Sequence, residues 1–350
     1  MSREILIIRL SSIGDVLHCT PVAASLKAAW PDCRITWLVG EVCADLIKNN
    51  PDVDEVLVWS REHFDRHVRN REWQQALNSW RKLKKLLAAK SFYAALDIHG
   101  LFLTGMIARQ VRTRRRIGMA NARECNPLFM TETGAPLGTH IIDRYLGVLT
   151  RLGIKPACRD MVLTVTQEAK AFAARFLQAE NVSPADKLVV LVPGTTWATK
   201  NWPPEYFAAL AASLSPDFKV LLCGGKNETA LGRTITANAG TPVINAIGRT
   251  SLLEMAALLE QADAVIAGDT GPLYMAAALD TPTIGIFGPT DPAAYTPPGC
   301  RHAAAVSRQA CSFCNKTKCP AGKAAVCISR VTPGQVAWQL YQLLTGAAKQ

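Results

Sequence analysis

Short apolar runs separated by amphipathic stretches recur along the whole chain. In the first half, the runs with the composition of buried strands are 4–10, 34–39, 55–58, 94–98 and 116–118. The stretches between them that space their apolar residues as helices do are 15–29, 73–89 and 104–109. Strands that alternate with helices are typical of a doubly wound parallel sheet, so we predict an α/β fold.

The same alternation restarts after a polar, irregular stretch at 154–166, which follows a predicted helix at 141–152 and is predicted to be a linker. The second set of predicted strands is 188–192, 219–223, 243–246, 264–267 and 283–287, and its predicted helices are 206–213, 229–239, 251–261 and 271–279. Open α/β sheets hold ligands at the carboxyl ends of their strands. We therefore predict two Rossmann-like domains, residues 1–165 and 166–332, that face a ligand-binding cleft. They are followed by a C-terminal segment, 333–350, whose predicted helix is 333–345.

Composition agrees with a folded enzyme of this size. The chain has 350 residues, of which 49% are hydrophobic and 19% are charged, and two domains of ordinary size can each bury a core. The apolar run after the N-terminus is short, and no stretch approaches the roughly 18 apolar residues of a membrane helix. We expect a cytoplasmic protein.

Positive charge is concentrated in the first half. The formal net charge is +11. Residues 1–165 carry 24 Lys and Arg against 16 Asp and Glu, a net +8, and the remainder carries 15 against 12, a net +3. The excess predicts an anionic partner for the first domain: nucleic acid, a phospholipid surface, or a phosphorylated or carboxylated sugar.

The loop after the first predicted strand reads Ser11-Ser12-Ile13-Gly14-Asp15. Small residues there let the backbone approach a ligand closely, and Asp15 would stand at the edge of the cleft. The alternative is structural, because an aspartate at a helix start often only accepts backbone N–H bonds. Spacing alone does not separate the two.

In the second half, the loop after residue 192 contains Thr195, Thr196 and Lys200. Hydroxyls, backbone amides and a lysine charge directly after a strand could hold a diphosphate. The Gly and Lys spacing is not that of a Walker A loop. An ordinary loop with a solvated lysine is the alternative.

Two further loops of the second half follow predicted strands. Asp269, Thr270 and Gly271 begin a helix whose N-terminus could face an anion. Since a carboxylate would repel a phosphate, we expect Asp269 to contact a hydroxyl or another side chain. Glu228 could accept hydrogen bonds from a ribose diol, or only interact favourably with the dipole of the helix that it precedes.

Basic residues of the first half form two runs, at 61–71 and 112–116, and His140 and Arg144 lie four apart on one helical stretch. Residues four apart on a helix share a face. Such runs are usually solvated surface, and they gain interest here from the charge excess of the same domain.

Of eleven cysteines, seven are scattered and are expected to be buried apolar side chains in a reducing compartment. The other four form the pattern Cys311-x2-Cys314-x4-Cys319-x7-Cys327. Four thiolates could bind structural zinc or iron. Because the paired C-x2-C spacing occurs only once, reduced thiols and disulfides formed on isolation stay open as alternatives.

These motifs, in this order, resemble the bacterial ADP-heptose:lipopolysaccharide heptosyltransferases, glycosyltransferase family 9. The segments that carry the resemblance are 11–18, 97–101, 116–118, 193–203, 268–272 and 285–290. The resemblance implies the GT-B fold, in which two Rossmann-like domains face each other. It also implies inverting transfer of L-glycero-D-manno-heptose from ADP-heptose to the Kdo/heptose inner core of lipopolysaccharide.

The same resemblance implies roles for individual residues. Asp15 would be the general base that takes the proton of the acceptor hydroxyl. The residues implied to bind the donor are Gly14, Thr195, Thr196, Lys200, Glu228, Asp269, Thr270 and Gly271. No cofactor would be required for catalysis, because a lysine and helix-end amides rather than a divalent metal would offset the charge of the leaving ADP.

Acceptor binding is assigned to the first domain by the same resemblance. The residues implied are Arg61, Arg66, His99, His140 and Arg144, with arginines pairing with Kdo carboxylates. The acceptor is anionic and presented at the inner membrane surface, so the protein is expected there as a peripheral protein. The chain has Tyr274 where many members have a histidine, and only part of the family has the cysteine cluster.

Two other functions fit part of the sequence. One is a GT-B glycosyltransferase that uses another nucleotide sugar. The other is a basic nucleic-acid-binding protein, but the chain lacks interleaved aromatic and basic residues and any recognisable nucleic-acid-binding signature. We therefore expect no nucleic-acid partner.

Overall fold

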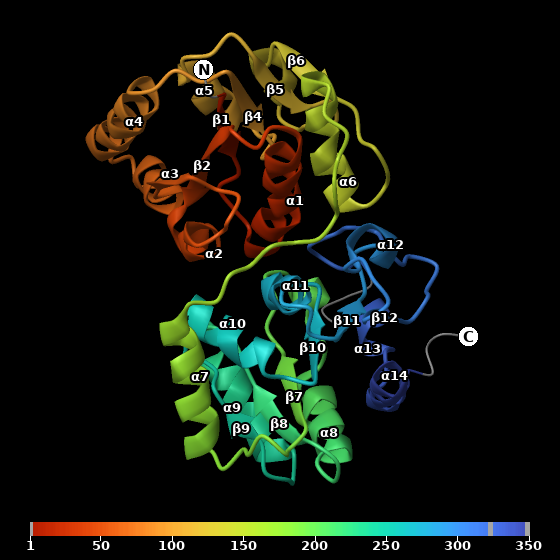
Figure 1. The fold of residues 1–350 in the computed structure, drawn as a ribbon. Coiled ribbons are helices and arrows are strands. Elements are labelled where there is room, and N and C mark those ends of the chain that lie inside the picture. Colours follow the sequence, from red (N-terminus) through yellow and green to blue (C-terminus); the bar gives the residue numbers. More distant parts are fainter. Residues whose placement is uncertain (1–2, 321–324, 347–350) are drawn as a thin grey trace. The chain divides into compact units, whose positions relative to one another are not determined.

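The computed structural model of the protein describes residues 3–320 and 325–346 (Figure 1). The chain divides into two compact units, unit 1 (Met1–Leu163) and unit 2 (Thr164–Gln350). Each unit contains one six-stranded sheet whose paired strands are all parallel. The predicted α/β class is confirmed.

The sheet of unit 1 has the strand order β3-β2-β1-β4-β5-β6. Its strands are β1 (Glu4–Ile8), β2 (Arg34–Gly40), β3 (Glu55–Trp59), β4 (Ala94–Asp97), β5 (Arg116–Met119) and β6 (Glu132–Gly134). This is the order of a Rossmann fold, in which the chain adds strands on one side of the first strand and then returns to add the others on its opposite side. The carboxyl ends of β1 and its neighbours β2 and β4 are therefore where a ligand site is expected.

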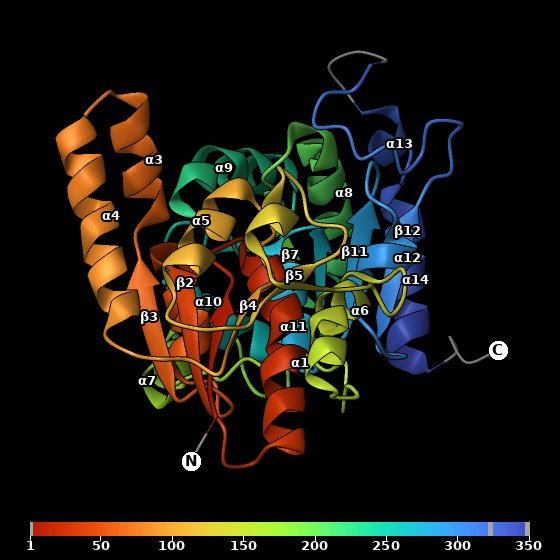
Figure 2. The same ribbon diagram turned by 90° about the horizontal axis from the view of Figure 1, so that it is seen from above.

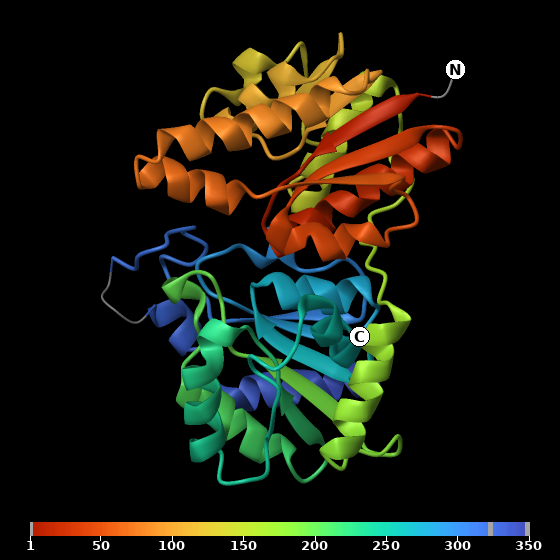
Figure 3. The same ribbon diagram turned by 90° about the vertical axis from the view of Figure 1, so that its left-hand side faces the viewer.

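Helices cover both faces of this sheet, and the views in Figures 2 and 3 show α3 and α4 side by side beyond the β3 edge. The helices are α1 (Ile13–Ala29), α2 (Ala44–Lys48), α3 (Arg61–Arg69), α4 (Trp73–Ala88), α5 (Phe102–Gln110) and α6 (Ile141–Leu146). The short 3₁₀ segments are η1 (Glu41–Cys43), η2 (Asn126–Phe129) and η3 (Gly147–Leu152). Helix α1 contacts α6 and α2, while α4 contacts α3 and α5. The helix predicted at 141–152 is thus an α-helix that continues as a 3₁₀ helix.

The sheet of unit 2 repeats this topology as β12-β11-β10-β7-β8-β9. Its strands are β7 (Leu188–Val192), β8 (Lys219–Leu222), β9 (Ile244–Asn245), β10 (Ala264–Gly268), β11 (Thr283–Phe287) and β12 (His302–Val306). Here β7 is the first strand, with β8 on one side and β10 on the other. The loops after these three strands therefore meet at one point of the sheet edge.

Two groups of helices pack on the sheet of unit 2. The α-helices are α7 (Gln167–Ala179), α8 (Pro204–Leu214), α9 (Thr229–Asn238), α10 (Leu252–Glu260), α11 (Gly271–Ala278), α12 (Pro292–Tyr295), α13 (Val326–Ser329) and α14 (Pro333–Thr345). The 3₁₀ segments are η4 (Ala198–Lys200) and η5 (Lys226–Glu228). Helix α10 contacts α7 and α11, and α8 contacts α9 and α14, so the C-terminal helix is part of this unit.

The central strands form the core of each unit. Every residue of β7, β10 and β11 is buried, as are Ile5 to Ile8 of β1. Strands buried on both faces are expected to be continuous apolar runs, which is the pattern that predicted them. Among the helices of the described residues, none combines the length and apolar composition that crossing a bilayer demands.

Candidate functional site

The site of unit 1 is centred on Asp15, in the first turn of α1 at the carboxyl end of β1. Its Oδ2 accepts a hydrogen bond from Ser12 Oγ (3.0 Å) and pairs with Arg9 Nη2 (2.6 Å), and its Oδ1 accepts from Tyr145 Oη (2.7 Å). The Asp15 side chain is 32% exposed, while that of Arg9 is only 7% exposed. Gly14 is buried beside it in the same turn. The carboxylate is therefore held by three groups and still reachable from solvent.

The charges around Asp15 keep it ionised. Burial by itself would raise the pKa of this carboxyl, but Arg9, His18 and the hydrogen bonds outweigh burial, and the pKa falls to about 2. A carboxylate has about four lone-pair positions. Three are used by Ser12, Arg9 and Tyr145, which leaves one for an incoming hydroxyl.

His99 and Arg61 lie beside this network. Arg61 Nη1 is 2.8 Å from His99 Nε2. The backbone N–H of His99 donates to the fully buried Asp97 carboxylate at the end of β4 (3.1 Å), which fixes the loop. Burial, followed by the charges of Arg9 and Arg61, lowers the pKa of His99 to about 3. The imidazole is thus neutral at physiological pH, and its Nε2 can accept from Arg61.

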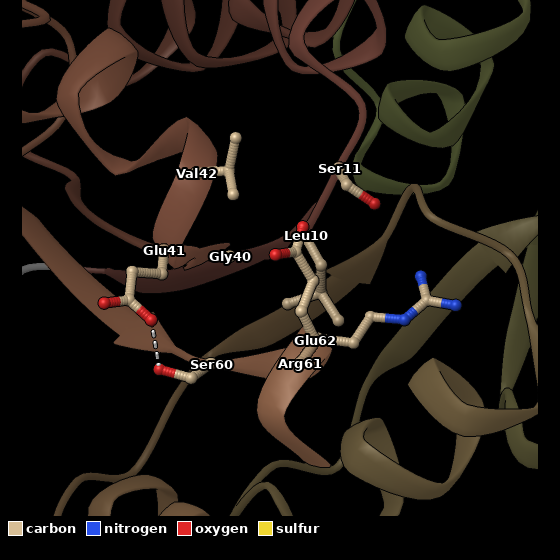
Figure 4. A pocket seen from close by; sticks show the side chains of 8 residues that line it. All are labelled: Leu10, Ser11, Gly40, Glu41, Val42, Ser60, Arg61 and Glu62. Carbon is tan, nitrogen blue, oxygen red and sulfur yellow. Dashed lines mark hydrogen bonds between the residues drawn. The ribbon is translucent and has the colours of Figure 1, made fainter. Parts of the chain in front are cut away.

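A pocket opens where β1, β2 and β3 end (Figure 4). Its lining residues are Leu10, Ser11, Gly40, Glu41, Val42, Ser60, Arg61 and Glu62. Ser60 Oγ donates to Glu41 Oε2 (2.7 Å), the dashed bond in Figure 4. At Gly40 a Cβ would lie 2.6 Å from the Leu10 carbonyl oxygen, so only glycine lets β2 pass there. Hydroxyl, carboxylate and guanidinium groups together are suited to hydrogen bonds with a polyhydroxylated ligand.

The remaining acceptor candidates of unit 1 have fewer contacts with the Asp15 network. His140 is the N-cap of α6, where its Nδ1 accepts from the backbone N–H of Ile142 (3.3 Å), and its ring lies 6.4 Å from that of His18. Arg144, one turn later, is half-buried and takes part in no ion pair within residues 3–320 and 325–346. Arg66 is exposed on α3. The structure brings Asp15, His99 and Arg61 together, and no contact ties Arg66 to them.

In unit 2, Glu228 occupies the space above two glycines. A Cβ at Gly194 would lie 1.7 Å from Glu228 Oε1, and one at Gly224 would lie 2.3 Å from Oε2. The backbone N–H of Gly225 donates to Oε2 (2.8 Å). Burial raises the pKa of Glu228, although that hydrogen bond opposes the rise. Glycines at the ends of β7 and β8 therefore leave room for one half-buried carboxylate.

Lys200 and Asp269 form an ion pair at the ends of β7 and β10. Lys200 Nζ is 2.6 Å from Asp269 Oδ2, and the two side chains are 15% and 6% exposed. Tyr274 Oη donates to the other Asp269 oxygen, and Lys200 Nζ lies 4.3 Å from the ring centroid of Trp197. Asp269 thus contacts a hydroxyl and another side chain, as predicted. Tyr274 is thus a hydrogen-bond partner of Asp269.

The other donor candidates surround this pair. Thr195 Oγ1 donates within its own loop, to the Trp197 carbonyl (2.9 Å), and Thr196 is exposed. Thr270 is the N-cap of α11 but makes no capping bond with its side chain, and Gly271 is the first helical residue. The Thr270 hydroxyl and the Gly271 N–H can therefore donate to an anion, whereas Pro272 has no N–H and that of Leu273 donates to the Thr270 carbonyl (3.1 Å).

The cysteine cluster is not supported as a metal site. Cys311, Cys314, Cys319 and Cys327 all line one pocket of unit 2. However, no three His, Cys, Asp or Glu side chains within the described ranges are placed to hold a metal ion. All eleven cysteines lie in the described ranges and are free. Of the seven scattered ones, Cys19, Cys33, Cys43 and Cys223 are buried as predicted. The prediction is wrong for Cys125 and Cys300, which are exposed, and for Cys158, which is half-buried.

Two residues of the two sites were missed in the sequence, and the partner of a third was not predicted. Arg9 had a signal, because a cation within the apolar run at 4–10 is unusual unless it is paired. Tyr145 lies on a helix far along the chain from Asp15 and carries no local signal. Tyr274 was noticed as a departure from the family, but its partner was not predicted.

Comparison with known proteins assigns the family. The sequence profile of glycosyltransferase family 9 (heptosyltransferase) matches residues 80–325, more than half of the chain. The chain belongs to this family. It is 27% identical over 360 aligned positions to lipopolysaccharide heptosyltransferase 1 of Pseudomonas aeruginosa, with 97% of this chain and 98% of the relative covered. It is 25% identical to lipopolysaccharide core heptosyltransferase OpsX of Haemophilus influenzae, with 84% and 82% covered.

Solved structures of family 9 enzymes have the same fold. The structure of the E. coli heptosyltransferase WaaC with ADP superposes with a TM-score of 0.74 at 23% identity, covering 97% of this chain and 99% of that one. The expected GT-B fold, with two Rossmann-like units, is confirmed. The relatives support heptose transfer in lipopolysaccharide core synthesis as the activity of this family 9 chain.

Proposed function

We propose that the chain transfers L-glycero-D-manno-heptose from ADP-heptose to a Kdo or heptose of the lipopolysaccharide inner core, with inversion at the anomeric carbon. The observation that carries the proposal is the Asp15 carboxylate, which is ionised, held by Arg9 and Tyr145, and one-third exposed. The family assignment and the names of the relatives supply the substrates.

Asp15 acts as the general base in a single displacement. The acceptor hydroxyl oxygen attacks the anomeric carbon, the bond from that carbon to the β-phosphate oxygen breaks, and the hydroxyl proton passes to Asp15. A carboxylate with a pKa of about 2 is a weak base for a free alcohol. The proton therefore moves late, after partial bonding to the anomeric carbon has made the hydroxyl more acidic. Arg9 and Tyr145 position the base rather than touch the substrate.

The donor binds to unit 2. Thr195, Thr196 and Thr270 supply hydroxyl groups for the diphosphate, and Glu228 accepts from the ribose. Lys200 is paired with Asp269. When the donor binds, the lysine charge is shared between Asp269 and the diphosphate, while Tyr274 continues to donate to the Asp269 carboxylate.

Charge neutralisation of the leaving ADP comes from the protein in this proposal. Lys200 and the Gly271 N–H at the start of α11 face the developing charge and need no divalent metal. Transfer also requires the Asp15 carboxylate to meet the anomeric carbon of the donor.

The acceptor binds to unit 1. Arg61 and His99 stand next to Asp15 and line or border the pocket at the ends of β1 to β3. Arg66, His140 and Arg144 extend this surface toward the Kdo carboxylates. Since the acceptor is lipid-linked, the protein acts peripherally at the inner membrane.

Product analysis tests the proposal. The purified chain is incubated with a Kdo-containing inner-core acceptor and either ADP-heptose or another nucleotide sugar, and products are identified by mass spectrometry and by NMR of the anomeric proton. We expect one added heptose of inverted configuration from ADP-heptose alone. Transfer only from a different nucleotide sugar would overturn the donor assignment, and retained configuration would overturn the mechanism.

A further inference from the structure

Positive charge and exposed apolar side chains coincide on one helix pair of unit 1. Residues 61–90, which comprise α3, α4 and their connections, carry nine Lys and Arg against three Asp and Glu, a net +6 of the +11 of the chain. Of the eleven large hydrophobic side chains exposed in the described ranges, four belong to these two helices: Val68, Trp73, Leu77 and Leu86. The helices pack on each other beside β3 (Figures 2 and 3).

Helix α4 separates its residues into a packed face and an exposed face. The packed face consists of Ala76, Leu83 and Leu87, which are buried. On the exposed face Trp73 and Leu77, one turn apart, are 62% and 47% exposed. Residues three and four apart on a helix are neighbours. The first two turns of this face are therefore an apolar patch.

The following turns of the same face are cationic. Arg81 is four residues after Leu77, and Lys84 and Lys85 are seven and eight residues after it, all exposed. The exposed face thus consists of an apolar patch that continues into three cations. We call Trp73, Leu77, Arg81, Lys84 and Lys85 the α4 stripe. None of the site residues belongs to the α4 stripe.

We propose that the α4 stripe docks the protein on an anionic phospholipid bilayer. Tryptophan is enriched at membrane interfaces, where its ring lies at the level of the headgroups. Each Lys or Arg near an anionic leaflet strengthens binding by roughly fivefold. A nucleic acid would satisfy the three cations, but a phosphate backbone cannot cover the adjoining Trp73 and Leu77. This inference goes beyond the proposed transfer, since it assigns a surface that no reaction step uses.

Vesicle co-sedimentation of the full chain tests the inference. The probes are vesicles of phosphatidylcholine alone and of phosphatidylcholine with phosphatidylglycerol, each at low and high salt. We expect binding to the anionic vesicles only, weakened by salt because exposed charges are screened. The variants are the pair Trp73→Ala with Leu77→Ala, and the triple Arg81→Gln, Lys84→Gln and Lys85→Gln. Each is expected to reduce binding at least tenfold.

Matched controls come from unit 2. Trp338 on α14 is 63% exposed, and Lys187, Lys219 and Arg233 are exposed cations. Trp338→Ala, and the triple Lys187→Gln, Lys219→Gln and Arg233→Gln, should bind vesicles as the wild type does. Thermal melting and ADP binding of the stripe variants should be unchanged, which separates lost docking from lost folding.

Three results would overturn the inference. The first is that the wild-type protein does not bind anionic vesicles. The second is that the stripe variants and the unit 2 controls lose vesicle binding equally. The third is that the wild-type protein binds random duplex DNA instead of vesicles and that the stripe variants lose this DNA binding. Transfer onto a water-soluble acceptor fragment is measured in parallel. The α4 stripe contains no site residue. Failure of the wild-type protein to transfer heptose to this fragment would therefore count against the proposed function and not against the docking inference.

Discussion

Gly194 has no room for a side chain, and its substitution isolates the role of Glu228. A Cβ at Gly194 would be 1.7 Å from Glu228 Oε1 and 2.0 Å from Cδ, closer than any non-bonded contact allows. The carboxylate is the end of a flexible side chain, so in Gly194→Ala it should move aside and leave unit 2 folded. It would then lose its place above the ends of β7 and β8.

The expected change in the Kd for ADP follows from the strength of the hydrogen bond that is lost. A hydrogen bond to a charged group contributes about 1.5–3 kcal/mol, so loss of the Glu228 contact with ribose should raise the Kd for ADP by about 10- to 150-fold. Isothermal titration calorimetry with ADP measures this, and the melting temperature of the variant checks the fold. Gly225→Ala is the matched control, because no atom lies within 4 Å of a Cβ at that position. An unchanged Kd in Gly194→Ala, with Glu228→Gln also unaffected, would refute the assignment of Glu228 to the ribose.

Three other changes test neighbouring parts of the account. Lys200→Met leaves the Asp269 carboxylate, which is 6% exposed, without its cation, so the free energy of unfolding measured in urea should fall by about 3 kcal/mol. The double variant with Asp269→Asn should regain the stability but not the affinity for ADP. Tyr274→Phe removes the hydroxyl that donates to Asp269 and should cost about 1.5–3 kcal/mol of stability, and an unchanged urea midpoint would contradict this. The fold lowers the pKa of His99 from 6.5 to about 3, so the unfolded chain is protonated first and the free energy of unfolding falls as pH drops from 6.5 toward 3. In thermal melts at several pH values, His99→Gln should flatten this dependence by up to about 1.4 kcal/mol per pH unit. An unaltered slope would count against the lowered pKa.

Periodicity was sufficient for most of the fold. The strand at 188–192, the strand at 283–287 and the last helix were predicted with the bounds that the structure has. Their apolar patterns are strong because both faces of each central strand are buried. Edge strand β12, with sequence HAAAV, was missed, since alanine has little preference for strands and the strand is only partly buried.

Two longer helices, α3 and α7, were also missed, as were the short helices α2, α12 and α13. Helix α3 has only Phe64 and Val68 as large apolar residues among nine, so its spacing reads as a polar loop. Helix α7 does carry a signal, because its buried residues Ala169, Ala173, Phe176 and Leu177 fall at helical spacing. It directly follows the linker, where the sequence was interpreted as irregular.

More of the candidate site could be predicted from the sequence in unit 2 than in unit 1. Loops that follow neighbouring parallel strands must meet at one sheet edge, so Lys200, Asp269 and Glu228 could be grouped from the sequence. The contact of Tyr145 with Asp15 spans 130 positions and depends on how α6 packs against α1. Packing of that kind is not encoded in any local pattern.

The transfer rate of Asp15→Asn tests the central claim most directly. The substitution keeps the shape of the side chain and removes the base, so single-turnover transfer from ADP-heptose to a Kdo acceptor should slow by about 100- to 10,000-fold. Affinity for ADP, which binds to unit 2, should stay unchanged. Asp217→Asn is the matched control, because Asp217 also accepts a hydrogen bond from a tyrosine (Tyr341 Oη, 2.6 Å) but lies in unit 2 away from the donor site. Transfer by Asp15→Asn within a few-fold of wild type would contradict the assignment of Asp15 as the base.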